Sequence, residues 1–278
     1  TYHISVVKYE TFATGAGFLH HNTGKALDVR TPLPTPEGWK TMGDIQVGDK
    51  VFDDNGKECN VTFVTEYQYD RECFEVVFDN GDTVIADAEH QWAVSLREHR
   101  RKAIKECKSV AESELVLQTK DLLDFQNKHY AIRLTEPVQY SEKELTIDPY
   151  VLGYWLGDGN TNTTILTIGD EDKIESLERI KSYGYSVKEY KQKYTYKLEN
   201  VFEDFKSLSV INNKHIPLIY LQGSVGQRLE LLRGLLDSDG SYNGRDDTIE
   251  FTSSDELLAT NVKELLASLG IKASLCKN

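Results

Sequence analysis

The stretch that decides how the chain is organised is Gly17-Phe18-Leu19-His20-His21-Asn22-Thr23-Gly24-Lys25-Ala26-Leu27-Asp28. An apolar strand leads into two histidines, an asparagine and a threonine. The side-chain amide nitrogen of Asn22 can attack its own main-chain carbonyl carbon and release Thr23, whose hydroxyl can accept an acyl group. His21 can transfer the proton, because imidazole titrates near neutral pH. An ordinary polar turn is the alternative interpretation of so short a motif.

Composition limits the classes of protein to consider. The chain has 278 residues and 39% hydrophobic content, enough for one large domain or two ordinary ones. No apolar run approaches the roughly 20 residues of a membrane helix, and no signal peptide is visible, so we expect a soluble, cytoplasmic monomer. The net charge of −13 argues against a surface that coats nucleic acid generally. The four cysteines lack zinc-type CxxC spacing and indicate reduced intracellular thiols.

The first half of the chain predicts short strands and turns. Residues 74–78 and 83–86 alternate in polarity across the turn signal Asp79-Asn80-Gly81-Asp82. Asp53-Asp54-Asn55-Gly56 is a second hairpin turn, and Pro32, Pro34 and Pro36 favour extended backbone. This pattern predicts a compact all-β unit.

A basic run from Arg97 to Lys108 interrupts the strands. Two interpretations are open: a solvated helix or loop, or an arm that contacts DNA phosphates. In the second interpretation the candidate DNA-binding residues are Arg97, Arg100, Arg101 and Lys102.

The second half predicts helices and strands in a repeated order. An apolar helix at 149–159 ends in an acid between glycines, and about 80 residues later helix 229–236 ends in Asp237-Ser238-Asp239-Gly240. Each is followed by strands, an amphipathic helix and another strand. These predicted elements are helices 173–182 and 255–269 and strands 185–187, 194–198, 249–252 and 271–275.

The repeated helix ends carry two acids that are candidate metal ligands. Small residues at Gly153, Gly157 and Gly234 let two helices pack closely, which brings Asp158 and Asp239 side by side. Two close carboxylates repel unless a cation lies between them, and oxygen ligands favour Mg²⁺. Candidate metal ligands are Asp158, Asp239, Gly157 and Ser238.

Leu152-Gly153-Tyr154-Trp155-Leu156-Gly157-Asp158-Gly159 and Leu232-Arg233-Gly234-Leu235-Leu236-Asp237-Ser238-Asp239-Gly240 resemble the two motifs of LAGLIDADG homing endonucleases. The resemblance implies a pseudo-twofold α/β fold that makes Mg²⁺-dependent double-strand breaks in DNA. Asn213-Lys214-His215-Ile216-Pro217 resembles the element that places a lysine near the scissile phosphate, which implies a catalytic role for Lys214. Asp237 is expected to be structural.

Two further segments resemble the ends of inteins. Phe12-Ala13-Thr14-Gly15, with residues 18–23, resembles the C-terminal end, and Ala26-Leu27-Asp28-Val29-Arg30-Thr31-Pro32 resembles the N-terminal end of Ala-initiated helicase inteins. The resemblance implies a Hint-type β fold that splices without a cofactor, by acyl shift, transesterification and asparagine cyclisation.

Gly81-Asp82-Thr83-Val84-Ile85-Ala86-Asp87-Ala88-Glu89-His90 resembles the intein motif that ends Thr-x-x-His. The resemblance implies that His90 protonates the nitrogen of the N-terminal scissile peptide. Asp87 stands at the threonine position, which puts oxyanion support there in doubt. Trp92 is similar to a tryptophan of inteins whose initiating cysteine lies on a late strand, but residues 2–4 show no such cysteine.

Ala26 occupies the splice-junction position and has no nucleophile. It is either natural, with the initiating thiol elsewhere, or a Cys→Ala substitution that traps the precursor. The C-terminal signal precedes the N-terminal one, so the order of the chain reads as circularly permuted. Gly24-Lys25 and Thr23 would rejoin as Gly-Lys-Thr in a host P-loop ATPase or helicase.

The sequence therefore predicts an α+β, multidomain chain. Residues 11–145 are expected to form the Hint-type splicing domain, with its blocks at 11–23 and 26–92. Residues 146–278, with residues 1–10 as a candidate return strand, are expected to form the LAGLIDADG endonuclease. Expected partners are double-stranded DNA at the host-gene insertion site and flanking host segments in cis, with no membrane. The alternatives are a splicing-defective or trapped intein acting as a DNA-binding, decayed nuclease module, and a Hint-type autoprocessing protein.

Overall fold

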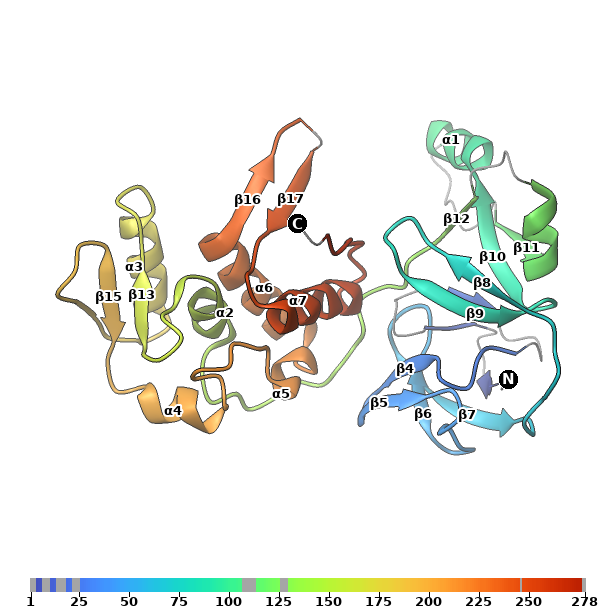
Figure 1. The fold of residues 1–278 in the computed structure, drawn as a ribbon, viewed down its shortest axis with the longest axis horizontal. Helices are drawn as coiled ribbons and strands as arrows, with labels where there is room; N and C mark the ends of the chain where they lie inside the picture. The colour runs from blue at the N-terminus through green and yellow to red at the C-terminus, as the bar shows by residue number, and fades with distance from the viewer. Residues whose placement is uncertain are drawn as a thin grey trace. The chain divides into compact units, whose positions relative to one another are not determined.

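The computed structural model describes residues 26–106, 114–125, 130–245 and 247–276, with the backbone of three short strands at 4–6, 11–13 and 19–21. These residues divide into two compact units (Figure 1). The first takes the described residues up to Gln139 together with 270–276, and the second takes Tyr140 to Leu269. None of the described helices has the length and hydropathy needed to cross a bilayer.

The first unit is built mainly of short antiparallel strands. Its pairings are β1-β7-β6, β11-β10-β12, β2-β3, β4-β5 and β8-β9. The bounds are β1 Ile4–Val6, β2 Thr11–Ala13, β3 Leu19–His21, β4 Pro32–Thr35, β5 Gly38–Thr41, β6 Lys50–Phe52, β7 Glu58–Val64, β8 Cys73–Val77, β9 Thr83–Asp87, β10 Gln91–Leu96, α1 Arg97–Lys105, β11 Leu115–Gln118, the 3-10 helix η2 Thr119–Phe125 and β12 Tyr130–Ile132.

Both predicted hairpin turns of this unit are confirmed. Asp79–Asp82 joins β8 to β9, and Asp53–Gly56 joins β6 to β7. The core beneath them gathers fully buried side chains from the start of the described chain and from β10, among them Leu27, Leu33, Val51 and Trp92. The segment after Ala26 is thus anchored in the core through Leu27.

The second unit contains two similar halves. Its bounds are α2 Pro149–Asp158, β13 Ile165–Thr167, α3 Lys173–Ser182, β14 Val187–Glu189, β15 Thr195–Leu198, α4 Phe202–Ser207, α5 Leu218–Leu221, α6 Val225–Asp239, β16 Gly240–Asn243, β17 Thr248–Phe251 and α7 Glu256–Ser268. The strands form the sheets β13-β15-β14 and β16-β17. The predicted apolar helix and the predicted second helix are confirmed in both halves, whereas strand β13, between α2 and α3, was not predicted.

Local sequence explains where the two central helices begin. The Asp148 side chain accepts the Tyr150 amide at the start of α2, and Pro149 occupies the first turn. Ser224 and Gln227 form a reciprocal capping box at the start of α6. Both helices end in an acid followed by a glycine with extended backbone, Gly159 and Gly240.

Three sequence expectations differ from the structure. Residues 271–275 form no strand and belong by contact to the first unit, where Lys272 Nζ lies 2.5 Å from a carboxylate oxygen of Asp79. β1 pairs with β7 in the first unit, so 4–6 is not a return strand of the second. β14 begins at Val187, two residues after the predicted start. Alternating short segments do not specify their partner, which explains the first two errors.

Candidate nuclease and splicing sites

Helices α2 and α6 pack against each other in the second unit (Figure 1). At two positions of this contact only glycine fits. A Cβ at Gly153 would lie 2.2 Å from the Leu231 carbonyl oxygen, and one at Gly234 would lie 2.1 Å from the Tyr150 carbonyl oxygen. The expectation that small residues permit this packing is confirmed at both positions. The close approach brings the C-terminal ends of the two helices together.

Asp158 and Asp239 are the last residues of these helices. A Cβ built on Gly157, next to Asp158, would lie 3.3 Å from Asp239 Oδ2. Burial, and then the charge of Asp239, raise the pKa of Asp158 to about 6, and burial also raises the pKa of Asp239. The two carboxylates therefore interact.

Lys214 lies at the same helix ends. Its Nζ donates to the Gly157 carbonyl oxygen at 2.7 Å and lies 5.4 Å from the centre of the Trp155 ring. Burial lowers the pKa of this ammonium group, although Asp239 and Asp158 both favour its charged form. The structure thus brings together Asp158, Asp239, Gly157 and Lys214.

The other residues near the helix ends have structural contacts. The Ser238 hydroxyl donates to the Gly234 and Leu235 carbonyls at 3.0 Å, so it is engaged within α6. Asp237 accepts from Tyr150 Oη at 3.0 Å and pairs with Arg179 at 2.5 Å. The sequence expectation of a structural role for Asp237 agrees with these contacts.

The donor chemistry of this site fits a magnesium ion. Two interacting carboxylates and a nearby main-chain carbonyl are the hard oxygen donors that Mg²⁺ takes, and this ion usually keeps several waters. Among the residues that the structure describes, no group of three or more His, Cys, Asp or Glu side chains is placed to hold a metal. Water or substrate phosphate oxygens would have to complete the coordination.

Ala26, the predicted splice-junction residue, lies beside the edge of β9. Ala26 is buried, and its carbonyl oxygen accepts the Asp87 amide at 2.9 Å. Leu27 forms an antiparallel β-bridge with Ala86, and the Asp28 amide donates to the Ile85 carbonyl at 3.0 Å. The segment from Ala26 to Asp28 therefore extends the β8-β9 hairpin on its open side.

His90 lies directly after this strand and is 1% exposed. Its amide donates to the Asp87 carbonyl at 2.9 Å, and its ring centre lies 4.9 Å from that of Trp92, edge to face. Trp92 Nε1 donates to Thr119 Oγ1 at 2.9 Å, and the Thr119 amide donates to the His90 carbonyl at 2.8 Å. Thr119 thus links His90 to Trp92. The sequence alone does not identify Thr119 as a site residue, because it is 27 residues from Trp92 and belongs to no motif.

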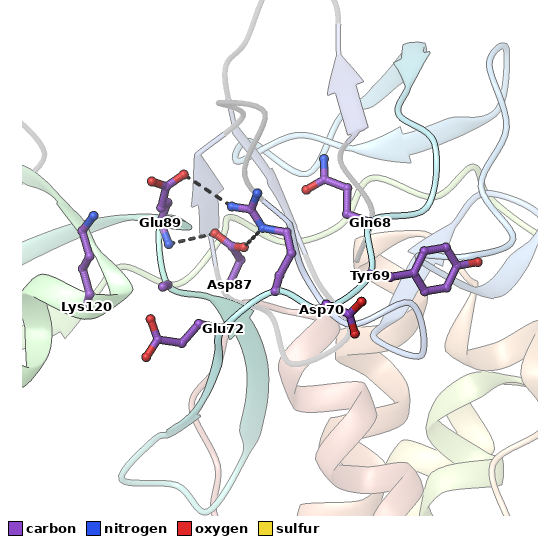
Figure 2. A pocket seen from close by; sticks show the side chains of 9 residues that line it. Gln68, Tyr69, Asp70, Glu72, Asp87, Glu89 and Lys120 are labelled. Atoms are coloured by element: carbon purple, nitrogen blue, oxygen red, sulfur yellow. Dashed lines mark hydrogen bonds and ion pairs between the residues drawn. The ribbon is translucent and has the colours of Figure 1, made fainter.

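Asp87 is paired with a cation. Its carboxylate accepts from Arg71 Nε and from the Glu89 amide, the latter at 2.8 Å, and Arg71 also reaches Glu89 at 3.4 Å (Figure 2). Burial alone would raise the pKa of Asp87, but these hydrogen bonds outweigh it and lower that pKa. The sequence alone does not identify Arg71 either. This residue lines a cavity of about 640 Å³, together with residues that include Glu72 and Lys120.

Several predicted site residues are only partly described. β3 ends at His21 and contacts β10, the strand of Trp92. The side chain of His21, and all of Asn22 and Thr23, lie outside the described residues. Their predicted roles at the C-terminal junction stay predictions.

The basic run forms helix α1 from Arg97 to Lys105. Arg100 donates to the Ser95 carbonyl at 2.6 Å and is therefore tied to the end of β10. Arg97, Arg101 and Lys102 are exposed. Contact of these three residues with DNA stays a prediction.

Comparison with known proteins adds a second line of evidence. The LAGLIDADG-like domain family matches residues 226–278. Replicative DNA helicase DnaB of Mycobacterium intracellulare is 34% identical over 263 residues, 90% of this chain and 43% of the relative. The chain therefore spans less than half the length of that curated relative.

Two solved structures are similar over a quarter of the chain. The crystal structure of the MchDnaB-1 intein is 48% identical, with a TM-score of 0.25, over 25% of this chain and 54% of that one. The Msm DnaB1 intein splicing domain bound with zinc is 45% identical, with a TM-score of 0.24, over 25% and 55%. The domain match and the helicase relative support the prediction of an intein that carries a LAGLIDADG endonuclease domain.

Proposed function

We propose that this chain excises itself from a host replicative helicase and cleaves DNA at the uninterrupted host-gene site. For splicing, the supporting observation is the hydrogen bond from the Asp87 amide to the Ala26 carbonyl. This hydrogen bond holds the N-terminal junction beside the turn that carries His90. His90 would donate a proton to the Ala26 nitrogen as its bond to Lys25 breaks. The initiating nucleophile is a thiol or hydroxyl that attacks the Lys25 carbonyl carbon.

At the other junction the proposed reaction uses Asn22. Its side-chain nitrogen attacks the Asn22 main-chain carbonyl carbon, and the bond to Thr23 breaks. His21 moves the proton from the attacking nitrogen to the Thr23 nitrogen, which leaves a cyclised asparagine and a free amine. The protein incubated at neutral pH should slowly release fragment 1–22, detected by mass spectrometry. If Asn22→Ala releases the same fragment at the same rate, cyclisation is not the cause.

The nuclease proposal rests on the paired acids at the ends of α2 and α6. Asp158 and Asp239 would hold Mg²⁺ with help from the Gly157 carbonyl, and the bound ion would orient water and stabilise negative charge on the phosphate. Lys214 would stabilise that charge as a second cationic contact beside the ion. The water oxygen adds to phosphorus, the bond to the leaving sugar oxygen breaks, and that oxygen takes a proton.

A plasmid carrying the uninterrupted helicase site tests this proposal. Asp158→Asn and Asp239→Asn should each slow cleavage by about 100-fold or more while leaving DNA binding in place. Asp170→Asn is the matched control, because Asp170 is an exposed carboxylate of the same unit. Cleavage retained by both site variants would rule out the metal assignment. We further propose that the chain acts as a monomer in the cytoplasm, where a replicative helicase works.

A further inference from the structure

Asp87, a residue with a buried carboxylate, connects the predicted splice junction to the turn that carries His90. Asp87 is the last residue of β9 and is 1% exposed. It pairs in register with Cys73 of β8 on one side, and its amide binds the Ala26 carbonyl at 2.9 Å on the other. Any motion of Asp87 therefore moves the junction and the turn together.

A negative charge at this position opposes the proposed reaction. Attack on the carbonyl group that precedes Ala26 puts negative charge on its oxygen, and a nearby carboxylate without a cation would repel that charge. The motif that this segment resembles has an uncharged threonine at the position of Asp87. A chain with aspartate here needs a local positive charge that a chain with threonine does not need.

Arg71 supplies that charge. Its guanidinium binds the Asp87 carboxylate through Nε and Glu89 through a second nitrogen at 3.4 Å (Figure 2). The other Asp87 oxygen accepts the Glu89 amide at 2.8 Å, and the Asp87 carbonyl accepts the His90 amide at 2.9 Å. The salt bridge orients the Asp87 carboxylate, and the two hydrogen bonds tie the turn from Asp87 to His90 to that residue.

We propose that Arg71 is a positioning residue for cleavage at the N-terminal junction, which neutralises Asp87 and holds the turn that presents His90 to Ala26. The inference rests on the proposed splicing function. It assigns to Arg71 no contact with the reacting atoms. Its action passes through Asp87, so the need for Arg71 disappears when Asp87 loses its charge.

This dependence separates charge compensation from a simple structural clamp. Arg71→Met leaves the Asp87 carboxylate buried without its cation. Adding Asp87→Asn removes the charge but keeps an oxygen that accepts the Glu89 amide. Arg133→Met is the matched control, because Arg133 is 35% exposed against 34% for Arg71 and pairs with Asp54 and Glu114 in the same unit.

Hydrogen exchange on the full chain measures the effect directly. Arg71→Met should speed exchange of the Asp87, Glu89 and His90 amides about tenfold or more. Adding Asp87→Asn should restore protection to within about twofold, and Arg133→Met should leave these amides unchanged. Unchanged protection in Arg71→Met, or no recovery in the double variant, overturns the proposal. If Arg71→Met does not fold, folding of the double variant supports the proposal, and failure of both overturns it.

A second readout connects the turn to the reaction. In an Ala26→Cys background, an added thiol should release the segment before residue 26 by exchange with the thioester that forms there. Arg71→Met should slow this release about tenfold, and Asp87→Asn should restore it. If the exchange results hold but the background chain releases nothing with Arg71 intact, the splicing function is refuted and the hold of Arg71 on the turn stands.

Discussion

Replacing Gly234 by alanine tests the helix contact on which the paired acids depend. The added Cβ would lie 2.1 Å from the Tyr150 carbonyl oxygen and 2.7 Å from the Tyr154 amide nitrogen, well inside ordinary contact. Both are main-chain atoms, so α2 and α6 have to separate. Overpacking of this kind costs about 1 to 3 kcal/mol, and here we expect the upper end because no flexible side chain can move aside.

The sign of the effect distinguishes this contact from ordinary helix propensity. Glycine to alanine inside an exposed helix stabilises by up to about 1 kcal/mol. Gly226, near the start of the same helix α6, is exposed and has only Ser224 Oγ near its Cβ position, at 3.9 Å. Gly226→Ala should therefore stabilise the second unit, whereas Gly234→Ala should destabilise it.

Because the chain has two compact units, a single unfolding midpoint is not a clean measure. Exchange of the α2 and α6 amides in moderate urea follows the second unit alone. We expect Gly234→Ala to exchange about 30-fold or more faster than wild type, which corresponds to about 2 kcal/mol. Equal protection in Gly234→Ala and Gly226→Ala would refute the close packing and, with it, the approach of the two acids.

Three further predictions follow from buried groups. The raised pKa of Asp158, about 6 against an ordinary 3.8, means that the folded state keeps its proton to higher pH than the unfolded state. The metal-free second unit should therefore lose about 1 to 2 kcal/mol between pH 4 and 6, measured by urea unfolding, and Asp158→Asn should remove most of this dependence. Thr119→Val leaves the Trp92 indole without its acceptor and should destabilise the first unit by about 1 to 3 kcal/mol in urea unfolding. Burial raises the pKa of Cys59 to about 12, so iodoacetamide at pH 8 should label exposed Cys276 well before Cys59, as peptide mapping would reveal.

Local sequence signals predicted turns and helices, but they did not predict contacts between residues that are distant in the sequence. The hairpin turn at Asp79–Asp82 and helix 173–182 follow from residues within a few positions of one another, and both appear as expected. The approach of α2 to α6 was predicted across 80 residues only because two glycine-bearing motifs repeat. Arg71 and Thr119 carry no such signal, since each matters only through the register of strands that bring it to Asp87 or Trp92.

The two candidate sites differ in how the charge of a buried carboxylate is balanced. The paired acids at the helix ends are proposed to bind a metal cation, whereas Asp87 already pairs with a cationic side chain of the protein. Asp158 and Asp239 lie at neighbouring helix ends, and their pKa values are raised despite the nearby Lys214. Asp87 is more completely buried, yet its pKa is lowered because Arg71 already neutralises it. Binding a divalent cation relieves repulsion at the first site and offers nothing to the second. Titrating Mg²⁺ should therefore protect the amides at the ends of α2 and α6 and leave the Asp87 turn unchanged. Protection at the Asp87 turn instead would mean that Arg71 does not compensate that carboxylate.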